Sequence, residues 1–231
     1  MSLESYIDSI KNKPPLFLTF EGGEGTGKTT QIQKIVELFT NAGIPFIYTR
    51  EPGGCESADN LRKLLLEGDD DKWDGVSEAL LYTAARNEHL RKVVRPAIAA
   101  GKWVVCDRFA DSTTVYQGDG RGIDRDDLLF LHNLVVKNSW PDITVILDID
   151  IETGLQRSAD TQGNLFQKDT TAEQRFENLD ISFHKKVREG FLRIAKENPG
   201  RCHVVDADGS IEEVHNRILE VIVQCTQERA A

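Results

Sequence analysis

Cysteine is scarce in this sequence, and its few copies are not arranged for a metal site or a disulfide framework. They form no C-x-x-C pair and have no neighbouring histidine at metal-ligand spacing: Cys55, Cys106, Cys202 and Cys225. Such spacing favours reduced thiols in a reducing compartment over a zinc site or a disulfide-stabilised scaffold.

Long apolar runs and an excess of positive charge are also missing. No apolar stretch approaches the roughly 18 residues of a membrane span, and no apolar signal segment follows the first residues. Lys and Arg number 28 against 38 Asp and Glu, a net charge of −10, which argues against binding to nucleic acid. We therefore predict a cytoplasmic protein with no membrane or nucleic-acid partner.

Short apolar runs alternate with segments of helical spacing along the chain. The runs predict buried strands at about 16–20, 44–48, 103–106, 143–147 and 203–205. Helices are predicted between and after them, including 57–67, 77–100 with Ser77 as cap, 124–137, one from about 153, one ending near 197, and 211–222. We predict an α/β fold with a doubly wound, five-stranded parallel sheet and helices on both faces. Residues 14–231 would form one domain, preceded by an arm at 1–13 that is either a loose helix or disordered.

A glycine-rich loop between the first predicted strand and a helix matches the pattern G-x-x-x-x-G-K-[ST] in full. Glycines let backbone N–H groups form an anion nest, and the following helix adds its positive dipole end. Lys28 is expected to reach the β- and γ-phosphates, and Thr29 to ligate Mg²⁺. The loop therefore predicts binding of Mg·ATP by Gly22, Gly23, Glu24, Gly25, Thr26, Gly27, Lys28 and Thr29.

The loop alone does not separate kinases from other phosphate-loop proteins. No N-K-x-D base-recognition sequence follows it, which argues against a GTPase. Asp148 and Asp150 could supply the acid of a motor ATPase after the fourth predicted strand. A buried strand that ends in a solvated turn would have the same sequence pattern without any catalytic role, and we favour that interpretation for both residues.

Charged or glycine-rich segments follow each of the first three predicted strands: 22–29, 50–54 and 107–108. Ligands of parallel sheets bind beyond the carboxyl ends of the strands, so these segments should converge. Together with two further segments, in one order and spacing over about residues 16–222, they resemble the thymidylate kinase family of the bacterial type. The segments are 20–30 (FEGGEGTGKTT), 49–54 (TREPGG), 80–86 (LLYTAAR), 107–109 (DRF) and 112–122 (STTVYQGDGRG). The resemblance implies γ-phosphoryl transfer from ATP to dTMP with Mg²⁺, giving dTDP and ADP, by a homodimer.

Two residues of the LLYTAAR segment are candidates for binding the base. Tyr82 lies four residues before Arg86, so both project from one helix face. An aromatic ring can stack on a pyrimidine, and a guanidinium can donate to a carbonyl oxygen. The resemblance implies these roles, with Arg86 facing thymine O4. A Tyr–Arg pair on a solvated helix is the simpler alternative.

Arg108 follows a strand and an acid, and its planar guanidinium suits a phosphoryl group because it can hold two oxygens at once. The resemblance implies that Arg108 grips the acceptor monophosphate, and that Asp107 orients it or helps to organise the Mg²⁺ shell. A strand-end ion pair is the alternative for both residues. Arg50 is a further candidate phosphate contact.

The resemblance also assigns groups to the sugar and the remaining base edge. Glu24 would face the 3′-hydroxyl, since a carboxylate within a phosphate loop is repulsive unless it serves another partner. Thr113 would meet the N3 edge. Tyr116 and Gln117 would form a wall near C2′ that crowds a ribose hydroxyl. Finally, the resemblance implies a cis peptide between residues 51 and 52.

Phosphoryl transfer needs positive charge over the migrating group, often from an arginine on a closing loop. Family members with an arginine in the phosphate loop supply it there, whereas this chain has Gly25 at that position. We therefore expect the charge to come from a lid at about 158–174, in which Lys168 is the one cation. Two arginines flank this lid and are the candidates for the catalytic cation, Arg175 first and Arg157 second. Surface ion pairs are their alternative role.

Two other functions stay open at the level of sequence. One is a kinase for another nucleotide or a nucleoside. The other is a phosphate-loop switch ATPase that signals to a protein partner, which gives no reason for Tyr82 and Arg86.

Overall fold

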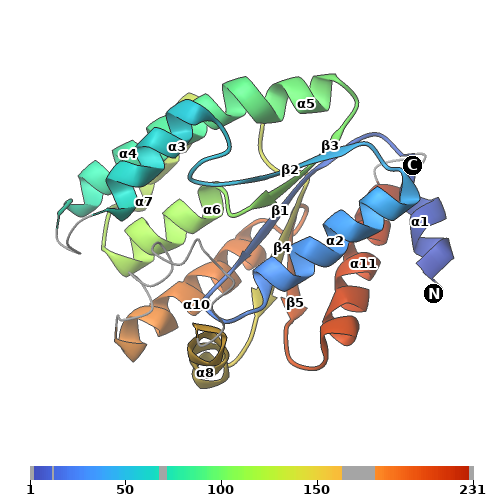
Figure 1. Cartoon of the computed structure of the whole chain (residues 1–231). Coiled ribbons are helices and arrows are strands. Elements are labelled where there is room, and N and C mark those ends of the chain that lie inside the picture. The colour runs from blue at the N-terminus through green and yellow to red at the C-terminus, as the bar shows by residue number, and fades with distance from the viewer. Residues whose placement is uncertain (1–2, 12, 68–71, 163–179, 229–231) are drawn as a thin grey trace.

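Five apolar strands form the centre of the fold. The computed structural model describes residues 3–11, 13–67, 72–162 and 180–228. The strands are β1 (Phe17–Gly22), β2 (Phe46–Arg50), β3 (Trp103–Asp107), β4 (Ile143–Asp148) and β5 (Cys202–Asp206). They are all parallel, in the order β2-β3-β1-β4-β5 (Figure 1). The predicted α/β fold with a five-stranded parallel sheet is confirmed.

Strand β1 shows how the two faces of the sheet are filled. Successive side chains of a strand point to opposite faces. Leu18 and Phe20 join one apolar core with α1, α2 and α11, while Phe17 joins a second core on the other face. Thr19 and Glu21 point to that second face and are fully buried, so a polar group lies inside the fold directly beneath the glycine-rich loop.

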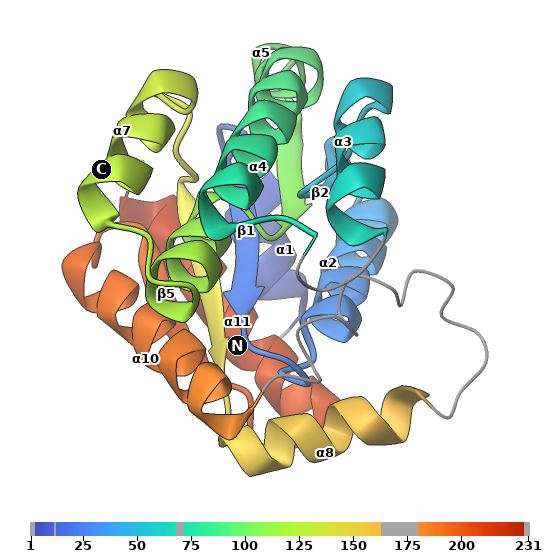
Figure 2. The same cartoon turned by 90° about the vertical axis from the view of Figure 1, so that its left-hand side faces the viewer.

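Helices cover both faces (Figure 1). On one face lie α1 (Leu3–Lys11), α2 (Lys28–Ala42) and α11 (Ile211–Glu228). The other helices are α3 (Glu56–Leu66), α4 (Gly75–His89), α5 (Arg95–Ala99), α6 (Ala110–Thr113), α7 (Arg125–Val135), α8 (Ile151–Gln162) and α10 (Ile181–Glu197). Two π-helical segments extend α4 and α6, namely η1 (Leu90–Val94) and η2 (Thr114–Gly120). Helix α8 lies beyond the carboxyl ends of β1 and β4 (Figure 2).

Several local expectations differ from the structure. The helix predicted at 77–100 begins at Gly75, because Asp74 and not Ser77 is its cap: the Asp74 carboxylate accepts from the Ser77 N–H at 2.8 Å. That helix also changes to π geometry at η1, just before Pro96, whose missing N–H breaks the regular α-helical ladder. The turn after β3, for which no helix was predicted, is the helical segment α6–η2.

The first residues are helical, one of the two forms predicted for the arm, but they pack against the fold. They form α1, which packs against α11 and buries Tyr6 and Ile10 in the core. Within the described part of the chain, no helix combines the length and apolarity needed to cross a membrane. The four cysteines are free thiols.

Candidate active site

The glycine-rich loop joins β1 to α2 and is shaped by positive backbone angles. Gly25 and Gly27 have φ of 66° and 84°, the left-handed region that favours glycine. Gly27 precedes α2 without a side-chain cap, so the helix presents its first N–H groups to a ligand. The buried Lys28 ammonium donates to the carbonyls of Gly22 and Gly23 at 3.1 and 2.7 Å. Thr29, the second residue of α2, is exposed.

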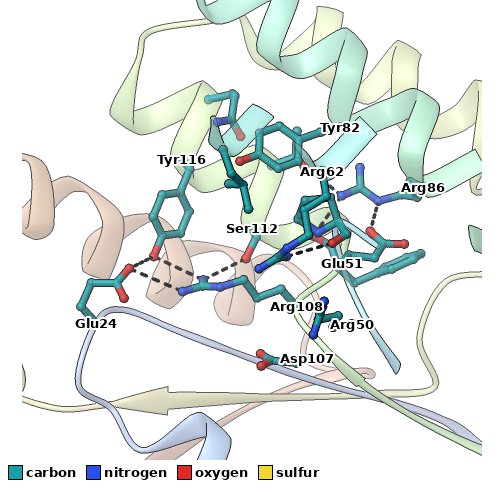
Figure 3. A pocket seen from close by; sticks show the side chains of 15 residues that line it. Glu24, Arg50, Glu51, Arg62, Tyr82, Arg86, Asp107, Arg108, Ser112 and Tyr116 are labelled. Atoms are coloured by element: carbon teal, nitrogen blue, oxygen red, sulfur yellow. Dashed lines mark hydrogen bonds and ion pairs between the residues drawn. The ribbon is translucent and has the colours of Figure 1, made fainter. Parts of the chain in front are cut away.

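Two cavities meet at Glu24. The first, which we call the donor cavity, runs along the glycine-rich loop and is lined by Glu24, Gly25, Thr26, Gly27, Lys28, Thr29, Thr30, Gln31, Arg157, Ser158, Asp160, Ala207, Gly209, Ser210, Ile211 and Val214. The second, the acceptor cavity, is an open hollow of about 720 Å³. It is lined by Glu24, Arg50, Glu51, Pro52, Arg62, Leu66, Tyr82, Arg86, Asp107, Arg108, Phe109, Ser112, Thr113, Tyr116 and Gln117 (Figure 3).

The three predicted strand-end segments do converge here. The register pairs Phe20 and Arg50 with Asp107, which places the ends of β1, β2 and β3 side by side. All eight residues predicted to bind the substrate line the acceptor cavity, namely Glu24, Arg50, Tyr82, Arg86, Arg108, Thr113, Tyr116 and Gln117.

Arg108 lies between the two cavities. Its backbone has φ of 63°, an uncommon conformation for a residue with a side chain, and such outliers concentrate at functional sites. The guanidinium stacks on the Tyr116 ring at 5.1 Å and reaches the Glu24 carboxylate at 3.5 Å. It also donates to Ser112 Oγ and Tyr116 Oη at 3.3 Å and to the Gly22 carbonyl at 3.4 Å. These bonds are longer than the 2.7–2.9 Å of strong charge-assisted bonds, so a phosphate could replace them.

Glu24 lines both cavities, and its carboxylate is bonded to residues of the acceptor cavity. Its carboxylate accepts from the Tyr116 hydroxyl at 2.8 Å. Burial raises the pKa of Tyr116 well above its ordinary value, so the phenol keeps its proton and acts as the donor. Gln117, one residue further along η2, is buried and donates to Glu78 at 3.2 Å.

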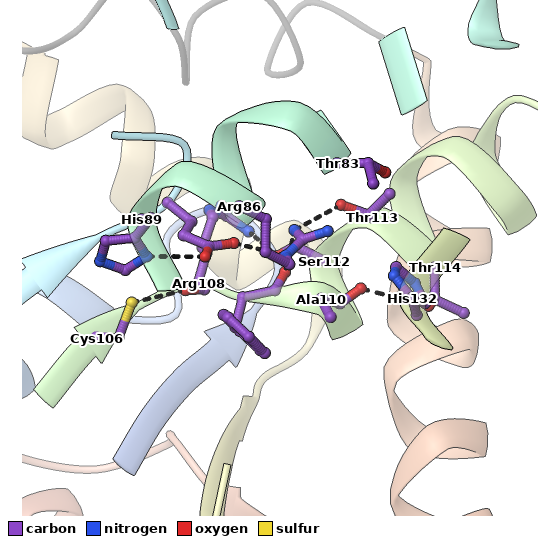
Figure 4. Close-up of polar contacts among 12 residues, drawn as sticks. Thr83, Arg86, His89, Cys106, Arg108, Ala110, Ser112, Thr113, Thr114 and His132 are labelled. Atoms are coloured by element: carbon purple, nitrogen blue, oxygen red, sulfur yellow. Dashed lines mark hydrogen bonds and ion pairs between the residues drawn. The ribbon is translucent and has the colours of Figure 1, made fainter. Parts of the chain in front are cut away.

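Arg86 is almost completely buried at the wall of the acceptor cavity. Its Nε donates to Glu51 at 2.7 Å, and its Nη2 donates to the Phe109 carbonyl at 3.2 Å and to Thr113 Oγ1 at 2.9 Å (Figure 4). The remaining nitrogen, Nη1, is buried and has no partner among the described residues. A buried guanidinium nitrogen of this kind needs an acceptor, and a ligand in the cavity can supply one. The peptide between Glu51 and Pro52 is cis, as the resemblance implied.

Asp107 does not form the ion pair considered for it with Arg108. Its Oδ1 is buried and has no hydrogen-bond partner in the described part of the chain.

Asp148 and Asp150 have the simpler roles that we favoured. Asp148 is held by Arg188 through bonds of 2.7 and 2.9 Å, and Asp150 accepts from the Glu152 N–H at the start of α8.

The predicted lid is described only in part. Its first residues continue α8, so the helix is longer than the sequence suggested. Arg157 lines the donor cavity and donates to the Ala207 carbonyl at 3.0 Å. Residues 163–179, which include Arg175 and Lys168, lie outside the described residues.

Sequence reasoning missed several residues of the site. Arg62 on α3 lines the acceptor cavity and donates to the Pro52 carbonyl at 2.9 Å. Glu21 lies just below the cavity and accepts from Phe109 N–H at 2.8 Å and Ser112 Oγ at 2.6 Å. The glutamate within FEGGEG was a visible signal for Glu21, whereas no pattern marks Arg62.

Burial raises the pKa of Glu21 from 4.5 to about 8, and the neighbouring Asp111 carboxylate adds to the effect. Hydrogen bonds from Ser112 and Phe109 and the charge of Arg108 oppose it. Between pH 4.5 and about 8 the folded chain therefore holds a proton that the unfolded chain has lost. The stability that this proton supplies is fully present below pH 4.5 and is lost as the pH rises through about 8.

We predict that Glu21→Gln removes this pH dependence, because the amide keeps the shape and an acceptor oxygen but does not titrate. The free energy of unfolding of the parent chain, relative to the variant, should fall by about 1.4 kcal/mol for each pH unit in that window. Denaturant unfolding of both proteins at pH 5, 6, 7 and 8 measures the difference. Parallel pH profiles for the two proteins would contradict the protonated state of Glu21.

Comparisons with known proteins agree with this geometry. The family model described as thymidylate kinase matches residues 20–218. A thymidylate kinase of Magnetococcus marinus is 46% identical over 198 residues, which is 86% of this chain and 90% of the relative. One from Geobacter sulfurreducens is 42% identical, covering 90% and 96% of the two chains.

A solved structure agrees as well. The crystal structure of thymidylate kinase from Ehrlichia chaffeensis has a TM-score of 0.73 and 35% identity, and the match covers 90% of this chain and 99% of that one. The residues that the family model matches include every residue lining the two cavities. The chain belongs to the thymidylate kinase family.

Proposed function

We propose that the protein transfers the γ-phosphoryl group of ATP to dTMP, producing dTDP and ADP. The observation that carries the proposal is the position of Arg108, which contacts the glycine-rich loop on one side and the acceptor cavity on the other. A kinase needs such a bridging cation where the migrating phosphoryl group crosses from donor to acceptor.

The donor cavity suits the triphosphate of ATP. The N–H groups at the start of α2 and the Lys28 ammonium face the same hollow along the loop. On phosphate binding, Lys28 would exchange its carbonyl partners, Gly22 and Gly23, for the β- and γ-phosphate oxygens.

The residues present also suit Mg²⁺. This ion binds through one or two protein oxygens, substrate phosphates and water. The exposed residue Thr29 supplies a hydroxyl beside the donor cavity, and Asp107 at the neighbouring strand end supplies a carboxylate oxygen that has no partner among the described residues. We propose these two residues as its protein ligands, and the ion would neutralise charge on the bridging phosphates.

The acceptor cavity suits thymine. Arg86 Nη1 can donate to the O4 carbonyl, and Thr113 Oγ1 has a second lone pair for the N3–H group. Tyr82, from the same helix face, lines the cavity where its ring can stack on the base. Cytosine would instead present an amino group to Arg86 and a bare N3 to Thr113.

The sugar and phosphate would then lie toward Arg108. The 3′-hydroxyl can donate to Glu24, and the Tyr116 and Gln117 side chains leave little room at C2′. Arg108 and Arg50 would hold the monophosphate for in-line attack, with no covalent enzyme intermediate. Further charge over the migrating group would come from Arg175, or from Arg157 if its bond to the Ala207 carbonyl is released.

A panel of acceptors tests the function by ADP release with Mg·ATP. We expect dTMP to be the best substrate, with kcat/KM for dCMP lower by about 100-fold or more, because two base contacts become mismatched. Equal rates for dTMP and dCMP would contradict thymine recognition. Thymidine as good as dTMP would point to a nucleoside kinase, and ADP release without any acceptor would favour a switch ATPase.

We also propose that the protein forms a homodimer. Helices α4 and α7 pack side by side (Figure 2). Both expose large apolar side chains, Val76 and Leu80 on α4 and Phe130 and Leu134 on α7. Such patches commonly mark protein interfaces. Sedimentation as a monomer at micromolar concentration would contradict the proposal.

The cytoplasmic location and the lack of a nucleic-acid partner stay predictions.

A further inference from the structure

The guanidinium of Arg86 is fixed by Glu51, which also lines the acceptor cavity. Glu51 accepts from Arg86 Nε at 2.7 Å, and the two side chains are only 3% and 2% exposed. A buried ion pair of this kind is directional, because the carboxylate decides which edge of the guanidinium stays available for a ligand. Glu51 therefore helps to determine where Arg86 Nη1 points, together with the two hydrogen bonds of Nη2.

The second oxygen of Glu51 is held by His89. The distance from His89 Nδ1 to Glu51 Oε1 is 2.9 Å, and the imidazole is fully buried. A carboxylate accepts, so Nδ1 carries the proton. In the neutral ring, Nε2 is then the acceptor for the Thr49 hydroxyl, which lies 2.7 Å away. Each hydrogen bond in the chain from Thr49 through His89 and Glu51 to Arg86 thus joins one donor to one acceptor.

The loop after β2 is fitted closely around this imidazole. Gly54 has φ of 87°, and a Cβ there would lie 2.4 Å from Thr49 Oγ1 and 2.7 Å from His89 Cδ2. Only a glycine allows the chain to pass so close to the ring. One imidazole therefore contacts the far end of the loop at Gly54 and holds its near end at Glu51.

His89 stands three residues after Arg86 and seven after Tyr82, on the same face of α4. Helix α4 ends at His89, and the π-helical turn η1 begins with the next residue (Figure 4). The side chain does not line the acceptor cavity itself. Any effect on the substrate must pass through Glu51 and Arg86.

We propose that His89 is a positioning residue for the acceptor. By donating to Glu51 it holds Arg86 with Nη1 directed at the base, and so sets the affinity for dTMP and the discrimination against dCMP. The inference rests on the proposed function. A buried histidine that only fills space would contribute to stability and leave base selection unchanged.

The test compares His89→Leu with His89→Asn. Leucine removes both ring nitrogens, whereas the asparagine amide can place a donor near the position of Nδ1. For His89→Leu we expect KM for dTMP to rise about tenfold or more, with kcat and KM for ATP changed less than about threefold. The ratio of kcat/KM for dTMP over dCMP should fall as well. His89→Asn should restore most of both quantities.

A double-mutant cycle with Arg86→Met separates positioning from packing. If His89 acts through Arg86, His89→Leu should have little further effect on KM for dTMP once Arg86 is replaced. Effects that multiply in the double variant, or an unchanged KM in His89→Leu, would overturn the proposal. A chain without activity toward dTMP before any substitution would instead reject the proposed function.

The wild-type protein provides a second measurement that does not depend on variants folding. Long-range ¹H–¹⁵N NMR spectra report which imidazole nitrogen carries the proton. We expect the His89 proton on Nδ1, both free and with dTMP bound. A proton on Nε2 alone would overturn the proposal, because Nδ1 could not then donate to Glu51.

Discussion

Replacing Arg108 with alanine should lower kcat about 10³-fold, the size of effect found for arginines that stabilise charge during phosphoryl transfer. The guanidinium lines the acceptor cavity beside Glu24, where the two cavities meet, and its hydrogen bonds to Gly22, Ser112, Tyr116 and Glu24 are each 3.3 Å or longer. Bonds of this length can give way to a phosphoryl group that binds beside them. Steady-state ADP release at saturating ATP and dTMP measures the effect.

The arginine geometry should matter as well as its charge. Arg108→Lys should keep only part of the activity, since an ammonium cannot hold two oxygens in one plane. Arg125→Ala is a matched control, because it removes an arginine that pairs with Glu197 on the surface, away from both cavities. An Arg108→Ala protein that keeps near-normal kcat would exclude Arg108 from the transfer step.

Part of this site was predictable because parallel sheets impose it. Each of the first three strands was visible as an apolar run, and each was followed by glycine or charge. Parallel strands carry their carboxyl ends to one edge, so the sequence predicted that the loop, Arg50 and Arg108 converge. The neighbouring places of β1, β3 and β2 in the sheet confirm this. The resemblance then assigned chemistry to Tyr82 and Arg86, which indeed share one cavity.

Residues that act through tertiary contacts could not be found this way. His89 contacts Glu51 across 38 positions of sequence, and Glu21 contacts Ser112 across 91. Neither contact produces a periodic pattern in the sequence. The packing of α1 could not be predicted either, because its sequence is polar and mixed, although Tyr6 and Ile10 are buried against the rest of the fold.

The relation between the glycine-rich loop and α8 was also invisible in the sequence. A Cβ at Gly25 would lie 1.7 Å from the Gly154 carbonyl oxygen, and one at Gly154 would lie 2.7 Å from the Glu24 carbonyl oxygen. Loop and helix thus touch backbone to backbone through two glycines. The absence of an arginine at position 25 is therefore a requirement of this packing, and the need for a cation elsewhere follows from it.

Gly25→Arg should for this reason lower kcat/KM for ATP by about 100-fold or more, although it adds the positive charge that other family members carry in the loop. Gly25 also has φ of 66°, which costs about 1–2 kcal/mol for any other residue. The side chain would have to displace α8 or the loop, and misplacement of phosphate-binding groups by about 1 Å can cost 10²-fold in rate.

Gly25→Ala should reproduce most of this loss, because the first side-chain atom already meets the Gly154 carbonyl. Gly200→Ala, at a glycine with open space around it, controls for glycine replacement in general and should leave kcat/KM for ATP unchanged. Initial rates at varied ATP for the three variants make the comparison. If Gly25→Arg were as active as the parent chain, α8 would have to move away from the loop at little cost in free energy. An arginine in the loop could then share the role proposed for Arg175 or Arg157.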